Sequence, residues 1–285
     1  MSLLLIVLIA ITLGMTGANN ASNSAGTVAG SKIVSYRNGI LIFVAGLTMG
    51  AVLEGGKLSG AIQGGALAGG FGTDSLQIIM GVTFAMILIA TAARLPLPIT
   101  QAIFGASIGS GLYLGIPLHL DIVIIVLASW ALTPFFAAFF SLALSKVLHR
   151  YTINSVGATV VIYGILTILA SFYTAYVFGA NTLGLIIGVV KDNLGWSVSV
   201  ATAVIATSLG GIIVGERVSR TVGERVSGLG PSTAFASQMG GALTVHMFTQ
   251  GGIPVSISHA IIGGVSGGGL AKGGKALNRE TVVKL

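Results

Sequence analysis

The feature that most constrains this chain is a succession of long apolar segments with few or no charged residues. Seven segments share this character: Ser2–Met15, Ile40–Leu53, Leu76–Ala93, Ile122–Leu144, Val156–Phe178, Val198–Val214 and Thr233–Phe248. A helix that crosses a bilayer needs roughly 20 such residues, or fewer when it is short or tilted. The segments lack the alternating pattern of barrel strands. We therefore expect an all-α integral membrane protein, a multi-pass helical bundle of the cell membrane.

The composition supports a lipid-facing surface. Charged residues make up only 7% of the chain, against about 25% in a typical soluble domain. The net charge of +7 would suggest nucleic acid as a partner of a soluble protein. Here the basic residues lie mainly at the ends of predicted helices, as in cytoplasmic loops of membrane proteins, so we expect a lipid bilayer as partner and no nucleic acid. The loop with Arg217, Arg220 and Arg225 is the best cytoplasmic marker.

Three blocks of sequence occur twice in the same order. Gly-Ala-Asn at residues 17–19 recurs at 179–181, which is 162 positions later (179 − 17). The block Gly55–Ser59 matches 215–219, and Pro96–Gly105 aligns with Pro254–Gly263, 158 positions later (254 − 96). The shared order and nearly constant offset indicate an internal duplication.

Internal duplications are typical of secondary transporters, whose halves are often inverted and pack around a site near the membrane midplane. We divide the chain at about Arg150–Asn154. Residues 1–150 form the first transport repeat and residues 151–285 the second, and together they make one functional unit. The second repeat is shorter and lacks a counterpart of the helix predicted at 122–144. Either the short form is natural or a partner subunit supplies the surface, and a homodimer is left open.

The polar segment Thr16–Ser31 lies between two apolar segments and carries amide side chains at Asn19, Asn20 and Asn23. Non-helical backbone at membrane depth must be buried in protein or line a cavity. A surface loop is the simpler alternative. We favour a broken or re-entrant helix, because Gly-Ala-Asn recurs at 179–181 in far more apolar surroundings.

Two further segments, Pro96–Leu112 and Pro254–Leu270, begin with proline and continue into short apolar stretches rich in glycine and alanine. Proline near a helix start costs no hydrogen bond, and hydroxyl side chains cap free N–H groups. We expect two half-helices whose N-termini point into the protein and present N–H groups and partial positive charge to an anion. With the hydroxyls of Thr100, Ser256 and Ser258, they would encircle a tetrahedral oxyanion. The alternative role for the glycines is close helix packing.

The histidines carry different expectations. An ionisable residue inside a membrane segment is a functional hypothesis by default, so His259 either binds protons or the anion, or is a neutral residue bonded to a backbone carbonyl. We interpret His246, in a long apolar segment, as structural. The sequence shows no metal-binding spacing and no nucleophile–base set. We therefore expect no metal site and no enzyme activity.

These motifs resemble the inorganic phosphate transporter (PiT) family, whose members carry a duplicated signature near Gly-Ala-Asn-Asp-Val-Ala-Asn-Ala and a Pro-Val-Ser-Thr-Thr-His-Ala-like segment in each half. GANNASNSAGTVAGSK and GANTLGLIIG look like the signatures, and PLPITQAIFG and PVSISHAIIG like the later pair. The resemblance implies an oxyanion held between two re-entrant pairs, with sodium or protons as the coupling ion. By position, the signature residues are Asn19, Asn23 and Asn181, and the later-motif residues are Thr100, Ser256, Ser258 and His259.

The chain departs from the family pattern at four positions. The signature aspartate is Asn20 in the first half and Thr182 in the second, a signature asparagine is Leu185, and the first-half histidine is Gln101. Carboxylates are natural sodium ligands and can accept a proton from hydrogen phosphate, so their loss weakens the case for sodium coupling and for selectivity against sulfate.

The sequence therefore predicts a permease for inorganic phosphate that works by alternating access. The alternatives are a permease for sulfate or a related oxyanion, and a non-transporting membrane subunit. The expected substrate-binding residues are Asn19, Asn20, Asn23, Thr100, Gln101, Asn181, Thr182, Ser256, Ser258 and His259, with a weak sodium site near Asn19 and Asn181.

Overall fold

The computed structural model describes residues 3–30, 34–92, 98–150, 155–216 and 231–271. Within these ranges the chain is a bundle of helices without a named β-strand. Six helical stretches there are long and apolar enough to cross a membrane. The predicted all-α, multi-pass fold is therefore confirmed. The Arg217, Arg220 and Arg225 loop and residues 272–285 lie outside the described residues.

The first half contains five long helices and three short turns. They are α1 (Leu3–Ala21), η1 (Ser22–Gly26), α2 (Thr27–Gly30), α3 (Tyr36–Glu54), η2 (Gly55–Leu58), α4 (Thr73–Ala92), α5 (Ile99–Tyr113) and α6 (Leu120–Arg150). The second half follows with α7 (Val156–Phe178), η3 (Gly179–Leu183), α8 (Gly184–Leu194), α9 (Trp196–Ile213), α11 (Pro231–Gln250) and α12 (Ile257–Ala271). The division proposed at Arg150–Asn154 falls between α6 and α7.

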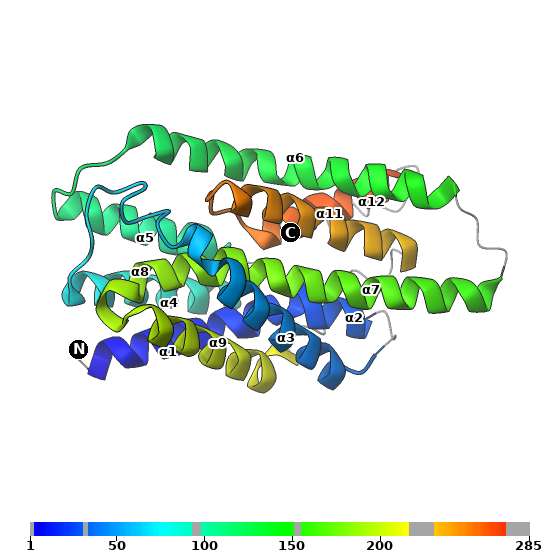
Figure 1. Ribbon diagram of the computed structural model, residues 1–285, viewed down its shortest axis with the longest axis horizontal. Helices are drawn as coiled ribbons and strands as arrows, with labels where there is room; N and C mark the ends of the chain where they lie inside the picture. Colours follow the sequence, from blue (N-terminus) through cyan, green and yellow to red (C-terminus); the bar gives the residue numbers. More distant parts are fainter. Residues whose placement is uncertain (1–2, 31–33, 93–97, 151–154, 217–230, 272–285) are drawn as a thin grey trace.

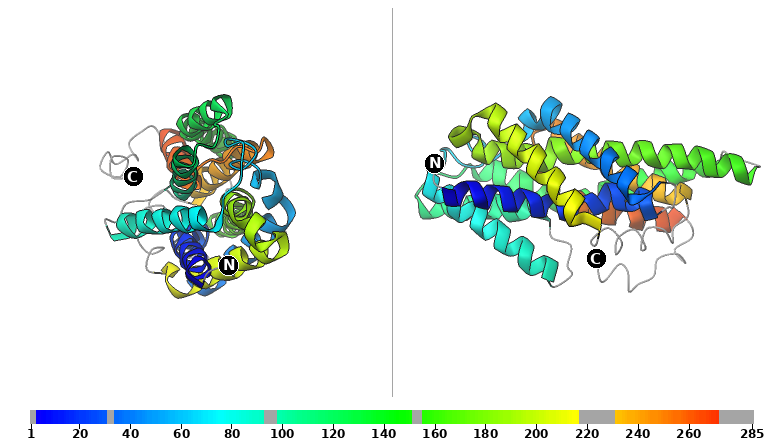
Figure 2. Two further views of the ribbon diagram at one scale, coloured as in Figure 1. Left: turned by 90° about the vertical axis from the view of Figure 1, so that its left-hand side faces the viewer. Right: turned by 90° about the horizontal axis from the view of Figure 1, so that it is seen from below.

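Corresponding helices of the two halves, such as α1 and α7, run in opposite directions. In Figure 1, α1 runs along the molecule from the end near the N-terminus, whereas α7 enters from the other end and runs back. The side view in Figure 2 shows most helices aligned with the long axis, with α4 and α9 inclined to it. An inverted repeat would produce this arrangement of matched helices.

The halves exchange matched contacts through glycine. α1 packs on α9, and α3 packs on α7. A Cβ at Gly17 would overlap the backbone of Thr207, and a Cβ at Gly179, the matching motif glycine, would overlap the backbone of Leu47. Small residues at such crossings let helix backbones approach closely in membranes. The motif glycines therefore hold the two halves together.

Close packing also joins the long helix α6 to the second half. Its buried side chains recur about every fourth residue and are small: Ser129, Thr133, Ala137, Ser141 and Ser145. This stripe faces α11 and α12, where a Cβ at Gly263 or Gly267 would overlap the backbone of Pro134 or Ala138. The packing role considered for the glycines of the later motif is thus confirmed at these two positions.

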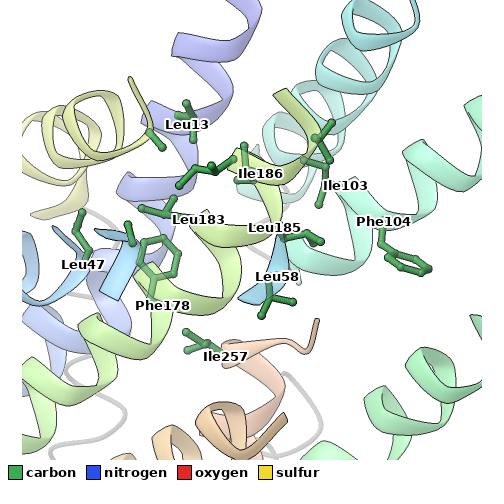
Figure 3. Packing of buried hydrophobic residues seen from close by; sticks show 14 of the residues in the cluster. Leu13, Leu47, Leu58, Ile103, Phe104, Phe178, Leu183, Leu185, Ile186 and Ile257 are labelled. Atoms are coloured by element: carbon green, nitrogen blue, oxygen red, sulfur yellow. The ribbon is translucent and has the colours of Figure 1, made fainter. Parts of the chain in front are cut away.

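The core lies around the end of α3 and the turn η3. Figure 3 shows Leu58, Phe178, Leu183, Leu185 and Ile186 gathered there, with Ile103 of α5 and Ile257 of α12 reaching in from two sides. All of these side chains are buried. Apolar contacts from both halves therefore fix where α5 and α12 begin.

Candidate substrate site

Both Gly-Ala-Asn motifs lead into π-helical turns inside long helices. The first turn, η1, covers residues 22–26 between α1 and α2, and the second, η3, covers 179–183 between α7 and α8. The expected re-entrant or broken helix is not seen at the first motif: the turn lies within a continuous helix that spans Leu3–Ala29, because a π-turn widens the helix without interrupting it. Single π-turns of this kind occur frequently at functional sites. A π-turn adds a residue to one helical turn, so the side chains that follow it face a different side of the helix. The helix itself continues, and no irregular loop is exposed to lipid.

The amides of the first turn bond mainly to one another. Asn20 donates from Nδ2 to the Thr16 carbonyl at 3.0 Å, and Asn23 Nδ2 donates to Asn20 Oδ1 at 3.3 Å. Asn20 and Asn23 are buried, and Asn19 is half-buried. Gln238 of α11 donates to the Asn23 carbonyl at 3.1 Å, while its own buried Oε1 has no partner in the described structure. Gln238 was not predicted from the sequence.

The second turn bonds outwards to other helices. Asn181 is fully buried and donates from Nδ2 to the Thr249 hydroxyl of α11 at 2.8 Å. Its Oδ1 is buried and finds no partner among the described residues. The Thr182 hydroxyl lies 3.5 Å from the Thr100 hydroxyl at the start of α5. Thr249 is a second site residue that the sequence did not reveal.

The two short helices α5 and α12 begin at buried residues. α5 and α12 each have 15 residues, about 22 Å of helix, which is shorter than the hydrocarbon core. Thr100 and Ser256, near their N-termini, are each only 2% exposed. In Figure 1, both helices start near the middle of the long axis and run towards opposite ends.

Only one of the two half-helices has the predicted hydroxyl cap. Ser256 Oγ accepts a hydrogen bond from the backbone N–H of His259 at 3.3 Å. At α5 the N-cap residue is Pro98, which makes no side-chain cap, and the Thr100 hydroxyl faces Thr182 instead. The hydroxyl cap expected for α5 is therefore wrong: a proline N-cap has no such group, and the nearest hydroxyl bonds across to the other half.

Each half-helix meets the π-turn of the opposite half. α5 of the first half reaches η3 through Thr100, and α12 of the second half packs against η1. Trp130 of α6 connects the two starts, because its ring packs edge-on against Phe104 of α5 and its Nε1 donates to the Pro254 carbonyl at 2.7 Å. Gln101, Ser258 and His259 are half-buried at the same helix starts.

The polar groups of this region are uncharged hydrogen-bonding groups. Amides, hydroxyls and the first N–H groups of two helices are buried together, and helix N-termini favour negative charge. No group of three or more potential metal-ligating side chains occurs in the described part of the chain. Two cavities, of about 720 and 500 Å³, lie elsewhere: the first is lined by Lys146, His149, Arg150 and Ala271, and the second by residues of α1 and α9.

The model of the phosphate transporter family matches residues 16–163 and 154–285, which together cover nearly the whole chain. The chain therefore belongs to the phosphate transporter family. The predicted resemblance is confirmed.

Individual relatives differ in the anion that their names give. The "Putative phosphate permease MJ0630" of Methanocaldococcus jannaschii is 28% identical over 261 residues, covering 92% of this chain and 82% of that protein. The "Sulfate permease CysP" of Bacillus subtilis is 26% identical over 275 residues, covering 94% of this chain and 77% of that one. A solved structure, "The sodium-dependent phosphate transporter", matches with a TM-score of 0.85 at 20% identity over 99% of this chain and 92% of that one. That likeness shows a shared fold.

Proposed function

We propose that this protein is a secondary permease that binds inorganic phosphate between its two half-helices and π-turns and moves it by alternating access. One observation carries the proposal: α5 begins, buried, at the asparagine turn η3 of the opposite half, and α12 of the second half packs against η1 of the first. An anion between them would contact both halves at once. Rocking of one half against the other would then change the side from which the site opens.

Two buried side-chain oxygens without a hydrogen-bond partner in the described structure support the same assignment. Buried polar atoms are normally hydrogen-bonded, and exceptions often mark functional positions. Asn181 Oδ1 and Gln238 Oε1 are such exceptions, one beside each π-turn. Oxygens of this kind suit the protonated oxygen of hydrogen phosphate or a coupling cation, whereas the adjacent N–H and O–H groups suit the unprotonated phosphate oxygens.

Uptake of labelled phosphate into proteoliposomes tests the proposal. We expect saturable uptake that falls in Asn19→Ala, Ser256→Ala and Ser258→Ala. Loss of one hydrogen bond to a charged group costs about 1.5–3 kcal/mol, or roughly tenfold to a hundredfold in affinity. Uptake that is unchanged in all three variants would rule out this site.

Sulfate is the second candidate substrate. The aspartates of the family signature are replaced here by Asn20 and Thr182, and a named sulfate permease is nearly as similar to this chain as the phosphate permease. Without these carboxylates, the site has fewer groups that accept a proton from hydrogen phosphate. Excess sulfate should leave labelled phosphate uptake unaffected if phosphate is the substrate, and should abolish it if sulfate competes.

A non-transporting membrane subunit is the remaining alternative. It predicts that the purified protein binds neither phosphate nor sulfate but associates stably with another membrane protein. Calorimetric titration with each anion separates this outcome from the two permease hypotheses.

A further inference from the structure

A cluster of ionisable side chains lies beside the second π-turn, outside the predicted site. Glu54, at the end of α3, accepts a hydrogen bond on Oε2 from Gln250 Nε2 at 2.8 Å, and the same oxygen lies 2.9 Å from His246 Nε2; both partners are on α11. The ring nitrogen Nδ1 of His246 lies 2.6 Å from the Tyr173 hydroxyl of α7. Three helices, from both halves of the chain, therefore meet at one glutamate–histidine pair.

A basic side chain and a second tyrosine also lie next to the Glu54–His246 pair. Lys57 of η2 lies 3.6 Å from Glu54 Oε1 and donates a hydrogen bond to the Gln250 side-chain carbonyl. The ring of Tyr176 of α7 lies 5.8 Å from the His246 ring. Ionisable residues in an otherwise apolar membrane bundle are costly and are retained mainly for function. The interpretation of His246 as a structural residue leaves this network unexplained.

His246 can change its protonation state without losing a partner. When Nε2 is unprotonated, it can accept from the adjacent Gln250 amide, and when it carries a proton, it can donate to Glu54. On the other side of the ring, the Tyr173 hydroxyl can donate or accept. Histidine is the side chain whose charge changes most readily between pH 5 and 8.

A sodium ion suits the same place poorly. Hard cations bind through several oxygen ligands. Glu54 is the one carboxylate of the cluster, and it already accepts from the Gln250 amide and lies near the Lys57 ammonium. The ammonium and the amide N–H groups would repel a metal cation, whereas a proton needs a single nitrogen or oxygen.

The pair is also joined to the candidate substrate site. His246, Thr249 and Gln250 lie within one turn of α11, and Thr249 accepts from Asn181 of η3 at 2.8 Å. Both side chains of the pair are about one-fifth exposed, so that protons can reach them. A change of charge at His246 therefore acts on the helix turn that holds Asn181.

We propose that Glu54 and His246 form the proton-binding site that couples proton movement to anion transport. A proton binds the neutral imidazole to give an imidazolium, which donates to Glu54 and Tyr173. This ties α3 and α7 more tightly to α11 while the anion is bound, and release of the proton loosens the contact. The inference rests on the proposed permease function.

Proteoliposomes with a pH gradient test the proposal. One proton coupled per anion would sustain up to about tenfold accumulation of phosphate for a gradient of one pH unit. In His246→Gln and Glu54→Gln we expect this accumulation ratio to fall to about one, while exchange of labelled for unlabelled phosphate without a gradient continues. Phosphate itself titrates in this range, but equally in wild type and variants. His119→Gln, at an exposed position, is the matched control and should accumulate as wild type.

The outcomes separate the two proposals. If wild-type vesicles show neither uptake nor exchange of phosphate or sulfate, the permease function itself is wrong. If exchange occurs but a pH gradient drives no accumulation, or if both variants keep the full gradient response, the proton site is wrong. Thermal unfolding in detergent identifies a variant that fails to fold, and the other variant then decides.

Discussion

The two Gly-Ala-Asn motifs, one beginning five residues before π-turn η1 and the other inside π-turn η3, have different hydrogen-bonding surroundings. At η1 the amides of Asn20 and Asn23 bond within their own helix, and α11 contributes Gln238 to the backbone. At η3 Asn181 and Thr182 bond to side chains of α11 and α5. The first turn bonds across to another helix through Ser24, whose hydroxyl lies 2.8 Å from the Ser171 carbonyl of α7, but its amide side chains stay within their own helix. At the second turn the asparagine side chain itself bonds to a neighbouring helix.

This difference indicates a division of labour. A turn whose side chains satisfy one another is rigid and offers few free groups. A turn whose side chains depend on other helices senses their movement, and it leaves Asn181 Oδ1 free for a ligand. We therefore expect substitution of Asn181 or Thr182 in η3 to affect transport, and substitution of Asn20, whose amide is satisfied within its own helix, to affect mainly stability.

Both Gly-Ala-Asn motifs begin with a glycine that packs against backbone of the opposite half, and its replacement should have the largest effect. Gly179→Ala and Gly17→Ala each place a methyl group on the backbone of Leu47 or Thr207. Overpacking of this kind costs typically 1–3 kcal/mol, and more where backbone must move. Thermal unfolding in detergent should show a lower midpoint for both.

Gly105→Ala is the matched control, because a Cβ there would meet no atom within 4 Å. It should be neutral or stabilising, since alanine is favoured over glycine by roughly 1 kcal/mol in a helix. A midpoint for Gly179→Ala equal to that of Gly105→Ala would mean that the halves do not pack through the motif.

The second-largest effect is expected at Asn181 of η3, whose side-chain oxygen has no hydrogen-bond partner among the described residues. Asn181→Ala should lower phosphate uptake by roughly tenfold or more, because a hydrogen bond to a charged ligand is worth about 1.5–3 kcal/mol. Asn38→Ala, an exposed amide at the start of α3, should leave uptake unchanged. Equal uptake in the two variants would remove Asn181 from the site.

The third effect is a coupling across the halves. Thr100→Val and Thr182→Val should each lower uptake several-fold, and the double variant should be little worse than either single one. Directly interacting residues show such non-additivity, with coupling energies of about 0.5–3 kcal/mol. Fully additive losses would show that the two hydroxyls act independently.

The smallest effect on transport is expected at η1. Asn20→Ala removes hydrogen bonds that stay within one helix, so the free energy of unfolding should fall by about 1 kcal/mol. Uptake by the protein that remains folded should stay close to wild type. A tenfold loss of uptake with unchanged stability would reverse the comparison between the turns.

The sequence predicted the parts of this arrangement that local patterns encode. Apolar segments gave the helices, the paired motifs gave Asn181 and Thr182, and the proline-led segments gave the buried starts at Thr100 and Ser256. The π-turns were not predictable, because their hydrogen bonds differ from those of an α-helix only by register. Whether a segment forms a π-turn or an α-helical turn depends on how the two halves pack.

The missed residues share a different cause. Gln238, Thr249, Glu54 and His246 lie in mainly apolar segments and belong to none of the motifs that occur twice. Their partners lie on other helices, far away in the sequence, as in the 192-residue separation of Glu54 and His246. The sequence pattern of one helix does not show which other helix its polar side chains will contact.

Calorimetric titration of the detergent-purified protein with phosphate measures the central claim most directly. We predict saturable phosphate binding to the wild-type protein and to Asn38→Ala, and at least about tenfold weaker binding to Asn181→Ala and Ser256→Ala, from the loss of one charged hydrogen bond each. Undiminished phosphate binding in both of these variants would show that the anion is held somewhere other than between the half-helices and the π-turns.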